Sequence, residues 1–304
     1  MIEGFGHSEL KVERSVDPPL REELVSIAPS PAVEPWLSPF VYRYDAHCGH
    51  VVHELPLLIP TVQIMLADDY WLRERGPDAK WAPVPRMAFW GPRVTWAYGY
   101  ARRVVRAFSF ALTPRGFDEI IGRPMESLID RAEDLASLNP KLAAALQRIV
   151  SRGGPDDWIC ETTDLILRSV DTSAHRTNEI DDTLHHLADE EGDAVARAAQ
   201  AAGLGDRQYR RLFRARYGLS PRLYRRILRV DRLIRQIHPA PWHKDEHTTV
   251  LTFADQPHMI REFKALTGVT PREYVRSKIA HNDPTIRSYI TTSIAPPSEK
   301  LFAR

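Results

Sequence analysis

Four arginines share one face of a segment near the C-terminus, and their side chains have the chemistry to recognise a nucleic acid. Arg207, Arg210, Arg211 and Arg214 follow one another at i, i+3, i+4 and i+7, which is the spacing of one helix face. A guanidinium can bond guanine through two hydrogen bonds, and a glutamine such as the neighbouring Gln208 can bond adenine in the same way. A helix face that is merely exposed to solvent could carry a similar stripe of arginines. The elements around this segment must therefore show whether the stripe binds a nucleic acid.

The same segment carries the start and stop signals of a helix. Asp206 is an acidic residue at the expected N-terminus, where it favours the helix. Tyr209, Leu212 and Phe213 fall at i, i+3 and i+4 and define a second, apolar face. Gly218 is expected to end the helix, because glycine readily adopts the left-handed conformation of a C-terminal cap. These signals predict a helix with one buried and one basic face.

A second helix is expected at about 221–237, because Ser220 and Pro221 supply an N-cap and a first helical residue. The whole arrangement then recurs. Residues 210–226 and 260–276 are identical at eight of seventeen positions after a shift of 50 residues. Such a repeat indicates a duplicated supersecondary unit.

An alanine-rich segment precedes the basic helix. Residues 196–202 contain five alanines and are followed by Gly203 and Leu204. Small side chains allow a second helix to cross closely, and the glycine provides the tight turn between the two. Helix, turn and basic helix together predict a helix-turn-helix, whose second helix enters the major groove of DNA.

Residues 193–278 resemble the DNA-binding domain of AraC-type (AraC/XylS) transcription regulators, in which one long helix joins two helix-turn-helix units. The matching segments read AAGLGDRQYRRLFRARYGLSP and FADQPHMIREFKALTGVTPREY. In that family the scaffold helix of the second unit is small and apolar and ends in Gly-Phe. Here residues 242–253 read WHKDEHTTVLTF, with Thr252 in place of the glycine. The departure implies that the second unit reads fewer bases than the first.

The resemblance and the repeat together imply DNA contacts in both units. Base contacts are expected from Arg207, Gln208, Arg210 and Arg211 in the first unit and from Gln256, Pro257, Ile260 and Arg261 in the second. Phosphate contacts, which position a protein without specifying sequence, are expected from Arg214, Arg222, Arg226 and Lys264. No catalytic residue, metal site or cofactor is expected.

Charge is distributed unevenly along the chain. The 304 residues carry a net charge of only +1, but residues 193–278 hold 18 Lys and Arg against 8 Asp and Glu. This segment therefore carries +10 and the remainder −9. The basic part suits a phosphate backbone, and the acidic part should avoid one.

Composition indicates a cytoplasmic protein. The two cysteines, Cys48 and Cys160, cannot form a disulfide framework and suit a reducing compartment. No apolar run is long enough to span a membrane, and the first residues lack the core of a signal peptide.

The first 192 residues change character twice. Residues 1–35 are polar and proline-containing, which predicts a loose N-terminal arm. Residues 36 to about 110 contain six short β-prone runs separated by Pro and Gly, namely PFVYRY, GHVVHEL, TVQIML, RMAFW, RVTWAYGY and RVVRAFSFAL. Such runs favour a sandwich or a barrel. Four helical patterns follow, namely PRGFDEIIG, PMESLIDRAEDLASL, PKLAAALQRIVSR and DDWICETTDLILRSV.

This order resembles the sensor half of AraC-type regulators, which is a cupin-like β-domain followed by helices that pair two subunits. The expected fold is therefore α+β, with an N-terminal cupin-like β-domain, a helical extension and a C-terminal all-α double helix-turn-helix domain. The expected divisions are an arm (1–35), a sensor (36–122), a dimerisation and linker region (123–192), the DNA-binding domain (193–278) and a tail (279–304).

Three other groups of residues could carry chemistry. The sequence HCGHVVHE at 47–54 is the nearest to a metal motif, but strand alternation puts His47 and His53 on one face and Cys48 and His50 on the other. His243 and His247 have i, i+4 spacing without an accompanying cysteine. Aromatic residues could line an effector pocket or form the β-core, namely Trp71, Trp81, Trp90, Trp96, Tyr98 and Tyr100. Structural roles are favoured for all three groups.

The sequence therefore predicts a regulator of transcription that binds double-stranded DNA. Its expected partners are a second copy of the chain, a small-molecule effector and RNA polymerase. Two alternatives stay open: an architectural DNA protein whose N-terminal half binds another protein, and an alkyl-transfer DNA-repair protein with a similar helix-turn-helix. The second would need a reactive cysteine among zinc-binding cysteines, and Cys48 and Cys160 lie far apart in the sequence.

Overall fold

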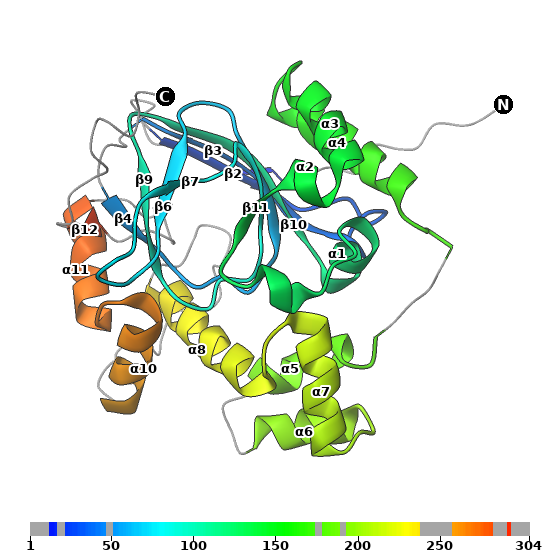
Figure 1. Cartoon of the computed structure of the whole chain (residues 1–304), viewed down its shortest axis with the longest axis vertical. Coiled ribbons are helices and arrows are strands. Elements are labelled where there is room, and N and C mark those ends of the chain that lie inside the picture. The colour runs from blue at the N-terminus through cyan, green and yellow to red at the C-terminus, as the bar shows by residue number, and fades with distance from the viewer. Residues whose placement is uncertain are drawn as a thin grey trace.

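The computed structural model describes residues 12–16, 22–46, 51–173, 178–188, 193–237, 257–281 and 291–292. The fold is α+β, with a β-sheet region in the N-terminal half and helices in the C-terminal half (Figure 1). Within the described residues, no helix has both the length and the apolar character needed to cross a membrane.

Two antiparallel sheets form the β-sheet region, and all of their strands except β12 come from the N-terminal half of the chain. The seven-stranded sheet has the order β1-β2-β3-β10-β5-β8-β11, and the five-stranded sheet the order β12-β4-β9-β6-β7. The bounds of the first sheet are β1 Val12–Val16, β2 Glu22–Ile27, β3 Leu37–Asp45, β10 Val105–Leu112, β5 Thr61–Met65, β8 Met87–Trp90 and β11 Ala132–Asp134. Those of the second are β12 Thr291–Thr292, β4 Val51–Glu54, β9 Ala97–Ala101, β6 Tyr70–Arg73 and β7 Ala82–Pro83.

All six expected β-prone runs contain a strand, but two further strands lie in the segment expected to be a loose arm. There β1 and β2 pair with each other, and β2 also pairs with β3. Their short, polar sequences give little periodic signal, and cross-strand pairing rather than intrinsic propensity sets their conformation.

One of the four helical patterns, PMESLIDRAEDLASL, is helical only at its two ends. A short 3-10 helix, η1 (Met125–Leu128), opens it, and α2 (Leu135–Leu138) closes it. Between the two lies strand β11, which follows Asp130 with its φ of 55°. A continuous helix over this pattern is therefore wrong, because the central residues pair with β8 instead.

Helices cover the outer face of the seven-stranded sheet (Figure 1). Besides α2 they are α1 Pro114–Ile120, α3 Pro140–Val150 and α4 Pro155–Ser169. Phe40, Phe108 and Phe110 of the sheet are buried with Leu146 of α3 and Trp158 of α4 in one apolar cluster. This core also holds residues of α1 and η1, which form one of the surfaces that the C-terminal helices contact.

The C-terminal half consists of short helices around one long one. Their bounds are η2 Asp181–Thr183, α5 Leu184–Ala188, α6 Ala194–Ala201, α7 Asp206–Tyr217, α8 Pro221–Ile237, α10 Pro257–Thr267 and α11 Pro271–His281. Ile180 and Leu187 are buried together with Tyr209 and Phe213. The first unit therefore recruits packing residues from upstream of the boundary expected at 193.

The second apolar cluster of the C-terminal half reaches into the N-terminal half. Leu55, which follows β4, is buried with Ile227 and Val230 of α8 and with Phe263 of α10. The two halves thus share a core, so the position of the C-terminal helices depends on the β-sheet region.

Candidate nucleic-acid interface

The first unit has the expected helix-turn-helix geometry. The Asp193 side chain caps α6 by accepting hydrogen bonds from the N–H groups of Val195 and Ala196, at 3.2 Å each. The turn that follows contains Gly203, with a φ of 65°. Helix α7 then ends at Gly218, whose φ of 73° is the left-handed cap expected from the sequence.

Burial of one face of α7 leaves its other face in solvent. Tyr209 and Phe213 are completely buried, and the Tyr209 hydroxyl lies 2.9 Å from Oγ1 of buried Thr183. Burial raises the pKa of Tyr209. This packing fixes the rotation of α7 about its axis, so that the arginine stripe faces outward.

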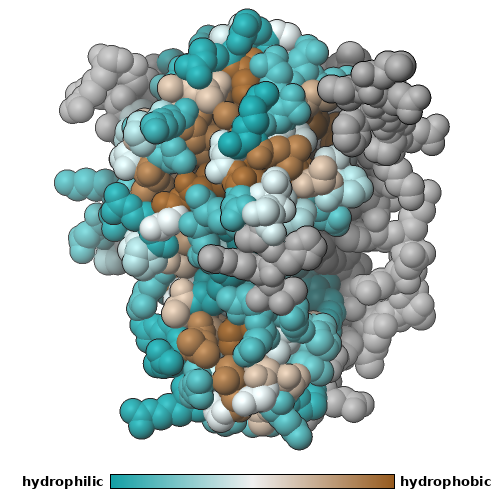
Figure 2. Space-filling model, turned by 90° about the vertical axis from the view of Figure 1, so that its right-hand side faces the viewer, coloured by the Kyte–Doolittle hydropathy of each residue, from teal (hydrophilic) through white to brown (hydrophobic). Residues whose placement is uncertain are grey.

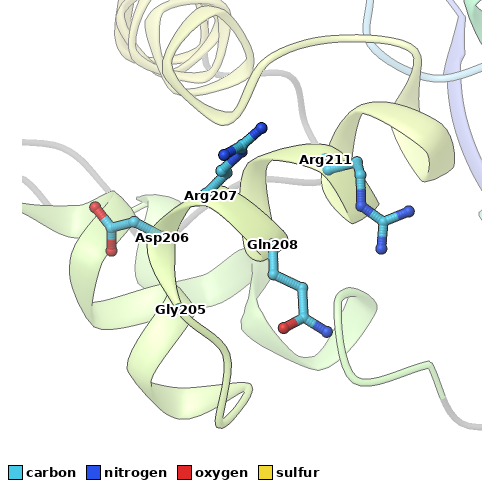
Figure 3. A pocket seen from close by; sticks show the side chains of 5 residues that line it. All are labelled: Gly205, Asp206, Arg207, Gln208 and Arg211. Carbon is cyan, nitrogen blue, oxygen red and sulfur yellow. The ribbon is translucent and has the colours of Figure 1, made fainter.

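The four residues expected to contact bases in the first unit are all exposed, namely Arg207, Gln208, Arg210 and Arg211. Three of them line an open hollow of about 800 Å³ at the start of α7, together with Gly205 and Asp206. Figure 3 shows the side chains of Arg207, Gln208 and Arg211 extending away from the helix ribbon. Free N–H groups at a helix N-terminus add further attraction for phosphate. The hollow therefore offers hydrogen-bond donors and positive charge at one end of the helix.

Arg210 and Arg211 differ in the partners that hold them. Nη2 of Arg210 lies 3.3 Å from Oδ2 of Asp206, one turn earlier. Both side chains are more than half exposed, so the pair contributes little to stability and can rearrange. Arg211 has no carboxylate partner among the ion pairs of the described residues. Its guanidinium is therefore the more available of the two.

The residues expected to contact phosphate have different surroundings. Arg222 and Lys264 are exposed. Arg214 donates a hydrogen bond to Glu126 of η1, which raises the pKa of its guanidinium. Nε of Arg226 lies 2.7 Å from Oε1 of Glu262 on α10. Two of the expected phosphate contacts therefore have carboxylate partners within the chain.

The second unit is described from α10 onward. Pro257 and Arg261 are exposed and Ile260 is half-buried, while Met259 and Phe263 are buried. Helix α10 ends at Gly268, with a φ of 83°, and a capping box between Thr270 and Glu273 opens α11. Gln256, the polar segment 242–252 and the pair His243 and His247 lie outside the described residues.

Both units touch the N-terminal half at positions related by the repeat. A Cβ added at Gly218 would lie 3.0 Å from the backbone nitrogen of Glu126, and one added at Gly268 would lie 2.6 Å from Cε2 of Trp96. Glycine is thus required at both positions, for its backbone conformation and for the close approach. The sequence alone does not reveal these contacts, because their partners lie far away along the chain.

Arg216, at the end of α7, connects three parts of the chain. Its guanidinium forms two hydrogen bonds with Asp181, at 2.6 and 2.9 Å, and an ion pair with Asp118 of α1. Its side chain is only 10 % exposed. Helix α7 is therefore joined to η2 through Asp181 and to the N-terminal half through Asp118.

A histidine joins the second unit to the five-stranded sheet. Nδ1 of buried His53 lies 3.1 Å from the carbonyl oxygen of Thr267, and its ring stacks on Trp96 with centroids 4.7 Å apart. Burial lowers the pKa of His53, while the hydrogen bond to Thr267 raises it to a smaller extent. His53 thus packs between the five-stranded sheet and the end of α10.

The other members of the HCGHVVHE motif, His47, Cys48 and His50, lie outside the described residues. Within the part of the chain that the structure describes, no group of three His, Cys, Asp or Glu side chains is arranged to hold a metal ion.

The aromatic residues considered as candidates for an effector pocket pack against neighbouring strands. Trp71 and Tyr100 are buried with Val51 on one face of the five-stranded sheet, with Trp81 and Tyr98 packed against them. Trp90 donates a hydrogen bond to Gln63 on the neighbouring strand.

Comparison with known proteins identifies the C-terminal domain. A family model described as a helix-turn-helix domain matches residues 198–277. The search of curated proteins gives no significant match.

Similar solved structures include two of ToxT from Vibrio cholerae strain SCE256 and one of the AraC-like transcriptional activator CuxR. An apo ToxT variant is 9 % identical, with 78 % of this chain and 97 % of that chain covered and a TM-score of 0.43. ToxT bound to an unsaturated fatty acid is 10 % identical, with 84 % and 97 % covered and a TM-score of 0.39. CuxR is 10 % identical, with 71 % and 85 % covered and a TM-score of 0.29.

The structural likenesses are weak, so the assignment rests on the match over residues 198–277 and on the helix-turn-helix formed by α6 and α7. Residues 198–277 are thereby identified as a helix-turn-helix domain, which agrees with the resemblance found in the sequence.

Proposed function

We propose that this regulator binds duplex DNA with α7 and α10 in successive major grooves on one face of the double helix. The observation that carries this proposal is the exposed row of Arg207, Gln208, Arg210 and Arg211 on a helix whose opposite face is completely buried. Recognition helices that read adjacent major grooves lie about 34 Å apart along the DNA. One monomer would then cover an asymmetric site with two differently read halves.

The two halves should contribute unequally. The first unit presents three exposed arginines and a glutamine, all of which can bond base edges in the major groove. The second presents Arg261, with Pro257 and Ile260 limited to apolar contact such as that with a thymine methyl. Gln256 completes the proposed base contacts. The proposed phosphate contacts are Arg214, Arg222, Arg226 and Lys264.

Control of DNA binding by the N-terminal half would pass through the contacts between the halves. Glu126 holds Arg214, and Asp118 holds Arg216, so that two carboxylates of the N-terminal half bind arginines of the recognition helix. A change in the position of α1 or η1 would free Arg214 for phosphate. We infer that a small-molecule effector acts in this way on a cupin-like sensor domain, and that RNA polymerase is the eventual partner on DNA.

Helices α3 and α4 are the proposed surface for a homodimer. Figure 2 shows apolar residues gathered in the upper half of the face that carries these helices. Leu138, Val150, Leu165 and Leu167 are among the apolar side chains that pack only partly into the neighbouring core. Exposed apolar patches often mark association surfaces.

Selection of binding sites from a pool of random duplexes tests the proposal. The full-length chain should enrich one asymmetric sequence, and Arg211→Ala should lose the preference at one or two base pairs within it. Enrichment of no sequence would contradict sequence-specific binding and would favour an architectural role. A thermal-shift screen against metabolites then separates the two kinds of N-terminal partner, because a small-molecule sensor should be stabilised by its effector.

A further inference from the structure

Glu262 lies in the middle of the face with which α10 packs against α8. Met259, Phe263 and Leu266 surround it at helical spacing, and all three are buried. The Glu262 side chain itself is only 5 % exposed. An ionised carboxylate in such a place is strongly unfavourable unless cationic groups compensate it.

Two arginines of α8 provide that compensation. Nε of Arg226 lies 2.7 Å from Oε1 of Glu262, and Nη1 of Arg229 lies 3.5 Å from Oε2. Arg226 and Arg229 are three residues apart and therefore project from one side of α8. We call these three side chains the α8–α10 ion cluster.

The repeat shows that the fold of a unit does not require this carboxylate. The position of Glu262 corresponds to Leu212 in the first unit, after the shift of 50 residues. Leu212 packs against the apolar core of the first unit. The corresponding place in the first unit is thus filled by an apolar side chain, and the buried charge is specific to the second unit.

An ion cluster can fix the orientation of two packed helices, which an apolar contact alone does not do. The remaining α8–α10 contact is formed by aliphatic and aromatic side chains such as Ile227, Val230 and Phe263. Apolar burial is not directional, so it tolerates rotation or sliding of one helix on the other. A planar guanidinium bonded to a carboxylate has a preferred geometry, and buried polar groups are known to fix the register of packed helices.

We propose that the α8–α10 ion cluster sets the orientation of α10 on α8. It thereby sets the orientation of the two recognition helices, α7 and α10, relative to each other. The second unit then reads its bases only when Glu262 is held by Arg226 and Arg229. Arg226 acts as a positioning residue through Glu262, in addition to the phosphate contact proposed above. The inference rests on the proposed DNA binding for its consequence, but the orientation itself is measurable without DNA.

The direct test is the distance between the two units in the full-length protein. Spin labels are placed at Gln200 on α6 and at Ala265 on α10, which are both exposed, after Cys48 and Cys160 are replaced by serine. Electron–electron resonance should give one narrow distance distribution for this protein. Glu262→Leu, which installs the residue of the first unit, should shift or broaden the distribution without unfolding the chain.

Glu262→Gln and Arg226→Lys test the same point with smaller changes. Glutamine keeps the shape but loses the charge, and lysine keeps the charge but loses the planar donor group. Glu273→Gln is the matched control, because Glu273 is an exposed carboxylate of the same unit that caps α11. It should leave the distance distribution unchanged even if it lowers the melting temperature.

The consequence for recognition is measured on the DNA sequence that the wild type selects. Base pairs read by each unit are first assigned with Arg211→Ala and Arg261→Ala. Glu262→Leu should abolish the roughly 5- to 150-fold discrimination expected of a good base contact at the second-unit positions, and keep it at the first-unit positions. An equal loss at both sets of positions would mean general destabilisation and would overturn the proposal.

The two readouts separate the proposal from the function on which it rests. If the wild type selects no DNA sequence, the proposed function fails, and the distance measurement still decides the role of Glu262. A distance distribution that is the same in the wild type, Glu262→Leu and Glu262→Gln contradicts the proposal, whatever the DNA result.

Discussion

Gly268→Ala should weaken the docking of the second unit on the N-terminal half. The backbone at Gly268 has a φ of 83°, and an alanine in this left-handed region costs about 1–2 kcal/mol. The added Cβ would also lie 2.6 Å from Cε2 of Trp96, whose ring is stacked on His53. Overpacking of this kind costs typically about 1–3 kcal/mol, so a total of roughly 2–5 kcal/mol is expected.

Gly203 supplies the matched control. Its φ is 65°, and no atom lies within 4 Å of an added Cβ. Gly203→Ala should therefore cost only the backbone strain of about 1–2 kcal/mol. Urea denaturation followed by circular dichroism measures both variants, and Gly268→Ala should be the more destabilised of the two.

A double-mutant cycle identifies the cause of the difference. In a Trp96→Ala background the clash is absent, so the cost of Gly268→Ala should fall to that of Gly203→Ala. A coupling free energy between positions 96 and 268 is then expected, because the two residues are in contact. Equal costs for Gly203→Ala and Gly268→Ala in the wild-type background would refute the contact between the second unit and Trp96.

Four further predictions concern recognition, division of the chain, dimerisation and pH. Arg211→Ala should weaken binding to the selected site by about 1–3 kcal/mol and relax the preference at one or two base pairs, whereas Arg214→Ala should weaken all sequences about equally and lower the salt slope by about one. Competition binding at several salt concentrations measures both, and an unchanged base preference for Arg211→Ala contradicts its assignment. A fragment that begins at residue 178, and so keeps Ile180 and Leu187, should bind DNA through the arginines of α7, whereas residues 1–192 should not bind because they are acidic. DNA binding by the 1–192 fragment would contradict this division of the chain. Light scattering should show the 1–192 fragment as a dimer, and a monomeric mass would contradict a dimer interface in this part of the chain. Burial lowers the pKa of His53 below its ordinary value of 6.5, so an undocked or unfolded chain binds the proton more readily. Docking should therefore weaken as the pH falls below about 6.5, with no effect of His53 above it. Nearby Tyr98 and Arg73 provide no negative charge at these pH values. The loss of melting temperature between about pH 7.5 and about pH 5.5 should be smaller for His53→Asn than for the wild type, and an equal loss would exclude His53 as the cause.

The helices of the first unit could be predicted from the sequence because their signals are local. Asp206, Gly218 and Pro221 mark the helix ends, and each acts within a few residues of its own position. The apolar face of α7 also follows from spacing alone, and Tyr209 and Phe213 are buried as expected.

Other strands cannot be predicted in this way, because pairing across the sheet determines them. The edge strand β11 lies inside a segment with helical spacing, but Glu133 pairs with Phe89 of β8, 44 residues earlier. Strand β6 begins with Tyr70 and Trp71, which lie between charged residues and give no alternating pattern. A one-dimensional pattern contains no information about such partners.

The contacts that join the two halves cannot be read from the sequence for the same reason. Glu126 and Arg214 are 88 residues apart, and His53 and Thr267 are 214 residues apart. In the sequence Glu262 is only a residue that differs from Leu212 in the repeat. The ion pairs of Glu262 with Arg226 and Arg229 form only because α10 packs on α8, and the sequence does not show this packing.

A high-resolution footprint of the full-length chain on its selected DNA tests the central claim most directly. Two protected patches are predicted on one face of the duplex, about one helical turn apart. Arg211→Ala should weaken protection mainly in one patch and Arg261→Ala mainly in the other, with the smaller loss of affinity for Arg261→Ala. A single protected patch, or the same protection on every DNA sequence, would contradict recognition by two helices.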